Sequence, residues 1–323
     1  EIISAGDVPL GTQGNLFGIT GGEGTGKSNY VAAIVAGCIC PAGAEVDTLG
    51  IQITANGRHK AVLLYDTEQS EVQLFKNVSN LLARAKQPDK PDELKAFCLT
   101  GMSRKERLNA IVQSMDKFYY QYGGIQLVVI DGIADLVKSA NDEAESVAVI
   151  DELYRLAGIY NTCILCVLHF VPNGLKLRGH LGSELQRKAA TILSIEKDDE
   201  PAQSVVKALK VRDGSPLDVP LMLFAWDKEA GMHVYKGEKP REEKEKRKER
   251  ELVNVAHDIF GRQTRITYID LCEQLQQVLD IKERTAKSYI RFMRERDIIT
   301  KDTANQSCFV IGSYHLQRNA SCP

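Results

Sequence analysis

The stretch GGEGTGKS, residues 21–28, limits the possible folds of this chain more than any other feature of its sequence. It fits the pattern Gly-x4-Gly-Lys-Ser, with an apolar run before it and a helix-forming run after it. Gly21, Gly24 and Gly26 let the backbone curl so that successive N–H groups point at one anion. The sequence therefore predicts a strand, a phosphate-binding loop and a helix whose positive dipole end faces the anion.

Such a loop holds the phosphates of a nucleotide, and we expect ATP and Mg²⁺ as ligands. Lys27 would reach the β and γ phosphates, and the Ser28 hydroxyl would ligate Mg²⁺. The alternative is a glycine-rich turn with a chance lysine, which the flanking strand and helix disfavour. The expected nucleotide-binding residues are Gly21, Gly22, Glu23, Gly24, Thr25, Gly26, Lys27, Ser28 and Asn29.

Up to about residue 197, short apolar runs alternate with stretches of helical periodicity. Near-continuous apolar strands that alternate with helices are typical of a mostly parallel sheet flanked by helices, so we expect an α/β fold. Helices are predicted over residues 70–85, 104–122 and 144–160. In the first of them, apolar residues recur at three- and four-residue steps, namely Val72, Leu74, Phe75, Val78, Leu81 and Leu82.

Two segments depart from this alternation. SVVKALKVRDG and PLMLFAWDKEAGMHVY predict consecutive strands without helices between them, which would extend the sheet antiparallel at one edge. In IQITANGRHKAVLLY, Asn56-Gly57 lies between two alternating runs and predicts an extra hairpin before the second parallel strand.

The chain of 323 residues is longer than one core usually fills, so two domains are expected. Residues 1–237 would form the α/β domain, and the almost entirely charged residues 238–251 a linker that runs into a helix. Residues 252–323 predict three helices and a two-stranded wing, the order of a winged helix–turn–helix. The net charge of −2 does not by itself require nucleic acid, although residues 238–323 hold 17 Lys and Arg against 14 Asp and Glu.

Eight cysteines are scattered along the chain, several within apolar runs. Cys163 and Cys166 form a C-x-x-C pattern inside TCILCVLHF; core packing is favoured there over a zinc or redox site. No apolar run approaches the roughly 20 residues that cross a bilayer, and no signal segment is evident. We expect a cytoplasmic protein with reduced thiols and no membrane partner.

Two acidic positions follow predicted strands. Asp131 lies at the end of the apolar run in IQLVVIDG and is expected on the Mg²⁺ side of the nucleotide, although a lone acid after a strand often only starts a turn. Glu68, in LLYDTEQS, is a candidate for activating the attacking water. Asp66 competes for this role, because alternation puts Asp66 and Glu68 on one face and spacing does not separate them.

The order of phosphate loop, strand with acidic DTE, Asp131 and CVLHF resembles that of RecA-like ATPases, over about residues 14–235. The nearest subgroup is the hexameric replicative helicases of the DnaB and RepA kind, including those carried by plasmids and mobile elements. The resemblance implies that Glu68 is the catalytic base. It also implies that His169 is a sensor of the γ-phosphate, whereas a histidine that closes a strand is otherwise often a satisfied edge residue.

The same resemblance gives a role to KALKVRDG. DnaB-like helicases carry a K-x-R-[ND]-G pattern on an outer strand, and its cations reach the nucleotide of the neighbouring subunit. Lys210 and Arg212 match these cations, which implies a ring homo-oligomer, with a hexamer expected. The alternative is a charged hairpin tip.

Two basic segments are candidate DNA contacts. In RecA-like motors, the loop after the fifth strand contacts single-stranded DNA, which here implies Lys176, Arg178 and His180; the alternative is a flexible surface loop. On the last predicted helix, one face is basic and another is apolar, typical of a recognition helix or of a surface that docks a primase or a loader. The basic residues are Arg284, Lys287, Arg291 and Arg294, and the apolar ones Ala286, Ile290 and Met293.

Together these features predict an ATPase that acts as a hexameric helicase on single-stranded DNA, in replication or transfer of a mobile element. A primase or a transfer protein is an expected partner. The alternatives are a recombinase- or loader-type ATPase that remodels DNA complexes, and a nucleotide-gated DNA-binding regulator.

Overall fold

A computed structural model describes residues 1–169, 179–198, 202–261 and 263–312. The chain divides into two compact units, Glu1–Lys239 and Pro240–Pro323. The candidates Lys176 and Arg178 lie outside the described residues.

The first unit is built on a nine-stranded sheet with the order β12-β11-β10-β9-β3-β8-β7-β5-β6. Six neighbouring strands run parallel, as the buried apolar runs predict. They are β9 (Thr191–Lys197), β3 (Leu16–Gly21), β8 (Cys163–His169), β7 (Ile125–Asp131), β5 (Ala61–Asp66) and β6 (Leu94–Cys98). The expected antiparallel extension at one edge is confirmed by β10 (Gln203–Val211), β11 (Leu221–Asp227) and β12 (Met232–Lys239).

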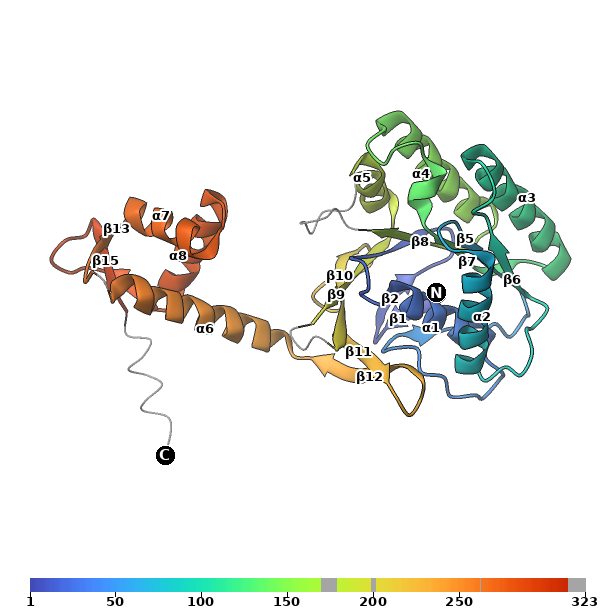
Figure 1. Cartoon of the computed structure of the whole chain (residues 1–323), viewed down its shortest axis with the longest axis horizontal. Helices are drawn as coiled ribbons and strands as arrows, with labels where there is room; N and C mark the ends of the chain where they lie inside the picture. Colours follow the sequence, from blue (N-terminus) through green and yellow to red (C-terminus); the bar gives the residue numbers. More distant parts are fainter. Residues whose placement is uncertain (170–178, 199–201, 262, 313–323) are drawn as a thin grey trace. The chain divides into compact units, whose positions relative to one another are not determined.

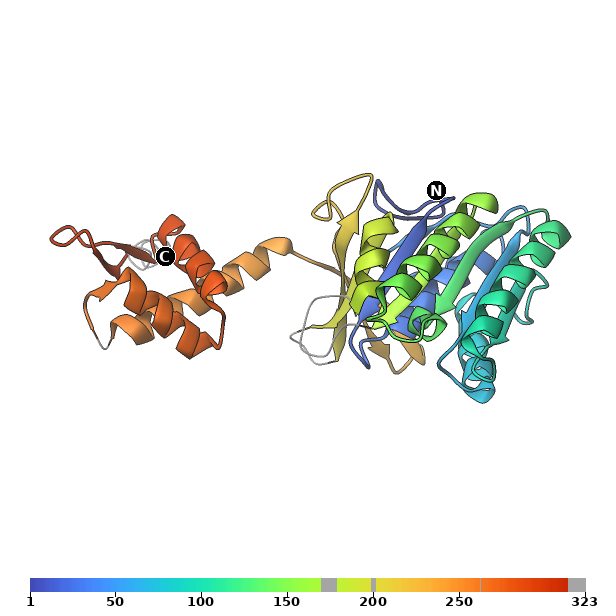
Figure 2. The ribbon, with the colours of Figure 1, turned by 90° about the horizontal axis from the view of Figure 1, so that it is seen from above.

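Helices cover both faces of this sheet, with α1 and α2 on one face and α3, α4 and α5 on the other (Figure 1). Figure 2 shows the second group along its face of the sheet. Each face has its own apolar core, so the fold is an α/β fold with a mostly parallel sheet flanked by helices, as expected. The helices are α1 (Lys27–Ile39), α2 (Glu71–Arg84), α3 (Arg104–Tyr122), α4 (Glu143–Ile159) and α5 (Gly179–Lys188), with a 3-10 turn η1 (Ile133–Leu136) after β7.

Local sequence explains where these helices begin. The hydroxyl of Ser70 accepts from the Gln73 N–H at the start of α2, and Asp142 caps α4 in the same way. At α3, Ser103 and Glu106 form a reciprocal capping box. The three helices predicted from apolar periodicity are therefore confirmed to within a residue or two at their ends.

The prediction of a hairpin around Asn56-Gly57 is wrong. β4 (Gln52–Ile53) pairs instead with β1 (Ile3–Ala5), which also pairs with β2 (Val8–Gly11) in a separate three-stranded sheet. The His59 N–H donates to the Asn56 carbonyl, and the Asn56 side chain accepts from the N–H of Lys60 and donates to its carbonyl, so backbone and side chain close the turn together. The Asn-Gly signal marks a turn, but not one between paired strands.

Part of the stretch expected to form a DNA-contacting loop is helical. α5 begins at Gly179, which has a left-handed φ of +64° and no room for a Cβ, because that atom would lie 2.3 Å from the Ala140 carbonyl oxygen. His180 is exposed in the first turn of α5. It is therefore a helical residue and not a loop residue.

Cys163 and Cys166 lie fully buried in β8, and burial raises the pKa of both thiols. Both thiols lie in the apolar core, as predicted, and this confirms core packing as their environment. Among the described residues, no helix combines the length and the apolar character needed to cross a membrane.

The second unit contains three helices and a small antiparallel sheet, β13-β15-β14. Its apolar core includes Leu271, Ile290, Met293 and Phe309. The charged stretch expected as a linker lies largely within the first helix. In chain order the elements are α6 (Arg241–Phe260), β13 (Ile266–Thr267), α7 (Tyr268–Leu279), α8 (Glu283–Glu295), β14 (Ile299–Lys301) and β15 (Cys308–Ile311).

Candidate nucleotide site

The phosphate loop joins β3 to α1 at the carboxyl end of the parallel strands. Gly24 and Gly26 have left-handed φ angles of +66° and +91°, which favour glycine. A Cβ on Gly21 would lie 2.4 Å from the Ile195 carbonyl oxygen, so a side chain is excluded there. Backbone conformation or close packing therefore requires glycine at each of these three positions. The first turn of α1 contains no acidic side chain that would repel an anion.

Lys27 is buried, and its ammonium group is turned into the loop. Its Nζ donates to the carbonyl oxygens of Gly21 at 3.0 Å and Gly22 at 2.6 Å. Burial lowers its pKa, while the carboxylates of Asp131 and Glu68 oppose that shift. The ammonium is thus held beside the position that phosphate oxygens would take. Ser28 and Asn29 follow it, both exposed, in the first turn of the helix.

The strand register brings the other predicted residues to the same edge. Gly21 pairs with His169 across β3 and β8, and Asp66 pairs with Asp131 across β5 and β7. Burial, followed by the nearby carboxylates of Asp66 and Glu68, raises the pKa of Asp131 to about 7. A half-buried carboxyl group beside two other acids is a position where a cation stabilises the charged form.

The structure separates Asp66 from Glu68, which spacing could not. Asp66 is buried, and its Oδ1 accepts from the backbone N–H groups of Glu68 at 3.0 Å and Gln69 at 2.8 Å. Its carboxylate therefore holds the turn between β5 and α2. The Glu68 carboxylate is one-third exposed and lies 3.2 Å from Nε2 of His169, the last residue of β8. Of the two acids, Glu68 is the accessible one.

Two residues of this edge were not predicted from the sequence. The buried hydroxyl of Thr67 donates to the carbonyl oxygens of Asp131 at 3.1 Å and Gly132 at 2.8 Å. Gly132 has a φ of +96°, and a Cβ on it would lie 2.4 Å from the Thr67 hydroxyl. The hydroxyl of Thr67 and the close approach of Gly132 thus hold the turn after β5 against the turn after β7. The sequence offered only a small residue after each acidic position as a signal.

A family model described as an AAA domain matches residues 5–173, which is more than half of the chain and includes the phosphate loop, Glu68, Asp131 and His169. The chain belongs to this AAA-domain family. The family match and the mostly parallel sheet fit a RecA-like ATPase. None of the curated proteins compared with the chain matches it.

The residues of this AAA domain fit a magnesium nucleotide. Among the described residues, no group of three or more His, Cys, Asp or Glu side chains could hold a metal ion by itself. Mg²⁺ keeps water and binds through few protein ligands plus substrate phosphates, so such a cluster is not needed. The Ser28 hydroxyl and the Asp131 carboxylate are the groups that would hold it here, next to the loop.

Lys210 and Arg212 do not lie at this edge. Lys210 Nζ donates to the carbonyl oxygens of Gln186 at 2.7 Å and Arg187 at 3.1 Å. The Arg212 guanidinium donates to the carbonyl oxygen of Lys188 at 2.9 Å and to Asn15 Oδ1 at 3.2 Å. Both cations therefore sit on the last carbonyls of α5, a position that the helix dipole favours.

The sheet geometry separates these cations from the phosphate loop of the same chain. Val211 pairs with Thr191, which in turn pairs with Phe17 near the start of β3. Asn15, which Arg212 contacts, precedes Gly21 by six residues along that strand, or roughly 20 Å of extended chain. An arginine side chain does not span that distance.

The basic face of α8 is exposed but partly neutralised. Lys287 pairs with Glu283 at 2.7 Å, and Arg291 pairs with Glu295 at 2.8 Å on the same helix. These two cations are therefore less available to an external partner than the sequence pattern predicts. The apolar face of the helix is buried as expected, through Ala286, Ile290 and Met293.

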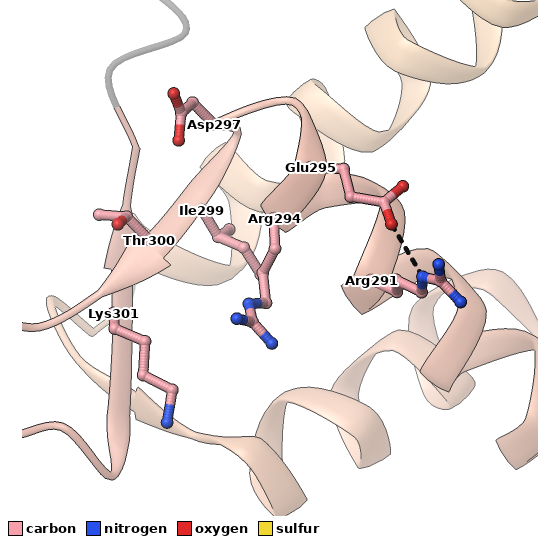
Figure 3. A pocket seen from close by; sticks show the side chains of 7 residues that line it. All are labelled: Arg291, Arg294, Glu295, Asp297, Ile299, Thr300 and Lys301. Atoms are coloured by element: carbon pink, nitrogen blue, oxygen red, sulfur yellow. Dashed lines mark hydrogen bonds and ion pairs between the residues drawn. The ribbon is translucent and has the colours of Figure 1, made fainter.

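The last cation of this face contributes to a hollow between α8 and β14. Figure 3 shows the side chains of Arg294 and Lys301 pointing to the same side of it, and those of Arg291 and Glu295 joined to each other. The Arg294 guanidinium lies 5.9 Å from the centre of the Phe309 ring, and Lys301 Nζ lies 5.5 Å from it. The aromatic ring holds the two cations together.

Proposed function

We propose that this ATPase is a motor that works as a ring homo-oligomer, a hexamer by resemblance, and moves single-stranded DNA as a helicase of a mobile element or plasmid. The nucleotide site at the carboxyl edge of the sheet and the element order of the second unit, that of a winged helix–turn–helix, support this proposal. A primase or transfer protein would be its partner.

In the proposed mechanism, Lys27 leaves the loop carbonyls and pairs with the β and γ phosphates. Mg²⁺, when bound, supplies positive charge beside these phosphates. Glu68 accepts a proton from the attacking water, since its carboxylate is the accessible one. His169 would feel the γ-phosphate and pass that state to the segment that follows it.

The observation that carries the proposal of a ring is the position of Lys210 and Arg212. They lie roughly 20 Å from the phosphate loop of their own chain, too far to stabilise charge there. On a neighbouring copy, a guanidinium at the transferred phosphoryl group would neutralise the charge that develops in the transition state. The active site would then be complete only between two copies.

DNA would be held by cations in both units. His180, in the first turn of α5, would contact the strand together with the segment before it. In the second unit, Arg284, Lys287, Arg291 and Arg294 would contact phosphates from α8. Contacts of this kind depend on charge more than on base sequence, so binding should weaken steeply with salt.

Unwinding of a forked duplex by the full chain, together with its ATPase rate with and without single-stranded DNA, tests the proposal. We expect DNA to stimulate hydrolysis, and Lys27→Ala to abolish both hydrolysis and unwinding. A wild-type protein whose ATPase rate ignores DNA and which separates no strands would rule out the motor.

A nucleotide-gated DNA-binding regulator is the second candidate. It is favoured by the fact that Lys210 and Arg212 already bond to α5 of their own chain, which is also what a purely structural role would look like. In that case, hydrolysis is slow and indifferent to Arg212→Ala. The full chain would then bind one duplex sequence far more tightly than others.

A further inference from the structure

The only tryptophan of the chain lies near the end of β11, and its side chain faces solvent. Trp226 is 55% exposed, whereas Phe224, two residues before it on the same strand, is fully buried. Residues two apart on a strand point to the same face of a sheet, and Phe224 packs on the face that α1 covers. The indole therefore continues a buried aromatic row out to the surface.

This face of β11 lies against the phosphate loop. A Cβ on Gly26, the last glycine of the loop, would lie 2.8 Å from Cε2 of Phe224. Strand pairing makes β11 run in the same direction as β3, so Trp226 lies roughly 7 Å further than Phe224 toward the carboxyl edge of the sheet. That is the edge where the phosphate loop would hold a nucleotide.

The indole is held in place by its neighbours. Trp226 pairs with His233 across β11 and β12, and their rings meet edge to face with centres 5.5 Å apart. The centre of the His233 ring is also 5.7 Å from that of Phe224, and burial lowers the pKa of His233, so its ring is neutral at pH 7. The carboxylate of Asp227 accepts from two backbone N–H groups of the turn that follows.

We propose that Trp226 is the stacking platform for the base of the bound nucleotide and that it favours a purine. The inference rests on the nucleotide site of the proposed function, but not on a ring or on DNA. With the phosphates in the loop, the ribose sets the base apart from them, and the aromatic row leads from Gly26 to the indole. An aromatic face stacks with any base, and the larger ring system of a purine covers more of it.

Intrinsic fluorescence of the full chain reports this contact directly, because no second tryptophan contributes to the emission. ADP with Mg²⁺ should quench the emission of Trp226. Tripolyphosphate with Mg²⁺, which fills the loop but has no base, should bind without quenching. Calorimetry measures binding independently, and CDP should bind about 3- to 10-fold more weakly than ADP.

Three results of these titrations would overturn the inference. They are ADP binding without a change in emission, equal quenching by tripolyphosphate, and quenching by an oligo-dT strand while ADP causes none. The last of these would assign the platform to a base of DNA.

Substitutions test the same contact through affinity. Trp226→Ala should weaken ADP binding about 10- to 100-fold and leave tripolyphosphate binding unchanged, whereas Trp226→Phe keeps an aromatic face and should retain most of the affinity. Tyr120→Ala is the matched control, because Tyr120 is 75% exposed on α3, which covers the opposite face of the sheet. An equal loss of tripolyphosphate affinity in Trp226→Ala, or equal ADP affinity in Trp226→Ala and the control, would contradict the platform.

The inference and the proposed function fail in different ways. If neither ADP nor tripolyphosphate binds, the nucleotide site fails and the platform fails with it. If ADP quenches Trp226 but hydrolysis ignores DNA, the platform stands and the motor fails.

Discussion

The two edges of the central sheet carry charged residues of opposite sign. At the carboxyl edge, Glu68, Asp131 and His169 surround the phosphate loop, and burial with like charge raises the pKa of Asp131 to about 7. At the other edge, Lys210 and Arg212 lie side by side, and burial together with the charge of Arg212 lowers the pKa of Lys210. Three acids therefore gather at one edge, and two cations at the other.

Under the proposed function, one chain therefore holds two halves of a site without joining them. The acidic half is fixed by Asp66 and Thr67, and the basic half by the last turn of α5 and Asn15. Within a single copy, neither half reaches the other. Substitutions at the two edges should therefore change different measured quantities, such as kcat or the free energy of unfolding.

Removing the basic half should have the largest effect. Arg212→Ala is expected to lower kcat of the assembled protein about 10³-fold with little change in nucleotide affinity, because the guanidinium acts on the transition state. ATPase rates and nucleotide titration measure the two quantities. Arg187→Ala is the control, since Arg187 is exposed at the end of α5 and pairs with Glu184. Equal rates for both variants would mean that Arg212 only caps α5.

The next largest effects should distinguish the roles of Glu68 and Asp66, the two acids at the end of β5. Glu68→Gln is expected to lower kcat about 10²-fold or more with unchanged stability, because a proton acceptor is lost. Asp66→Ala should instead lower the free energy of unfolding by about 1–3 kcal/mol, since two backbone N–H groups lose their acceptor. ATPase assays and urea unfolding distinguish them. The comparison fails if Asp66→Ala leaves stability intact.

The raised pKa of Asp131 predicts a pH-dependent stability. Between about pH 4 and pH 7, the folded protein keeps a proton that the unfolded chain releases, so the free energy of unfolding falls as pH rises. Asp131→Asn removes this cost and should stabilise the nucleotide-free protein by roughly 1–3 kcal/mol at pH 8. At pH 4 the difference should vanish. Unfolding curves at both pH values check the sign, and a variant less stable at pH 8 would contradict it.

The smallest effect is expected in the second unit. Arg294→Ala should weaken binding of single-stranded DNA about 3- to 10-fold and reduce the salt slope by about one, as for one phosphate contact. Fluorescence anisotropy across salt concentrations measures both. Arg296→Ala serves as control, because that side chain stacks on Phe292 within the same unit. A loss that is the same at every salt concentration would argue against a phosphate contact.

Much of the fold was predictable, because it depends on patterns within single elements. The phosphate loop, the parallel strands and the three periodic helices follow from local glycine spacing and apolar periodicity. The hairpin at Asn56-Gly57 was mispredicted because β4 pairs with β1, some fifty residues earlier in the chain. Pairing across such a distance leaves no local signal.

The site was predictable as a set of residues but not as an arrangement. Strand alternation put Asp66 and Glu68 on one face, and the backbone bonds of Asp66 and the exposure of Glu68 distinguish them in the structure. Apolar periodicity likewise could not tell the buried Leu74 from the exposed Phe75. The binding of Arg212 to Asn15 links positions 197 residues apart and could not be inferred from either motif.

The most direct test of a site shared between copies is to mix two inactive chains. Lys27→Ala lacks the nucleotide half and Arg212→Ala lacks the cation half, so each alone should hydrolyse ATP at background rates. In a mixture, the intact phosphate loop of the Arg212 variant meets the intact Arg212 of the Lys27 variant, and we predict that ATPase activity returns. Mixtures that stay inactive although the chains assemble together would contradict the account.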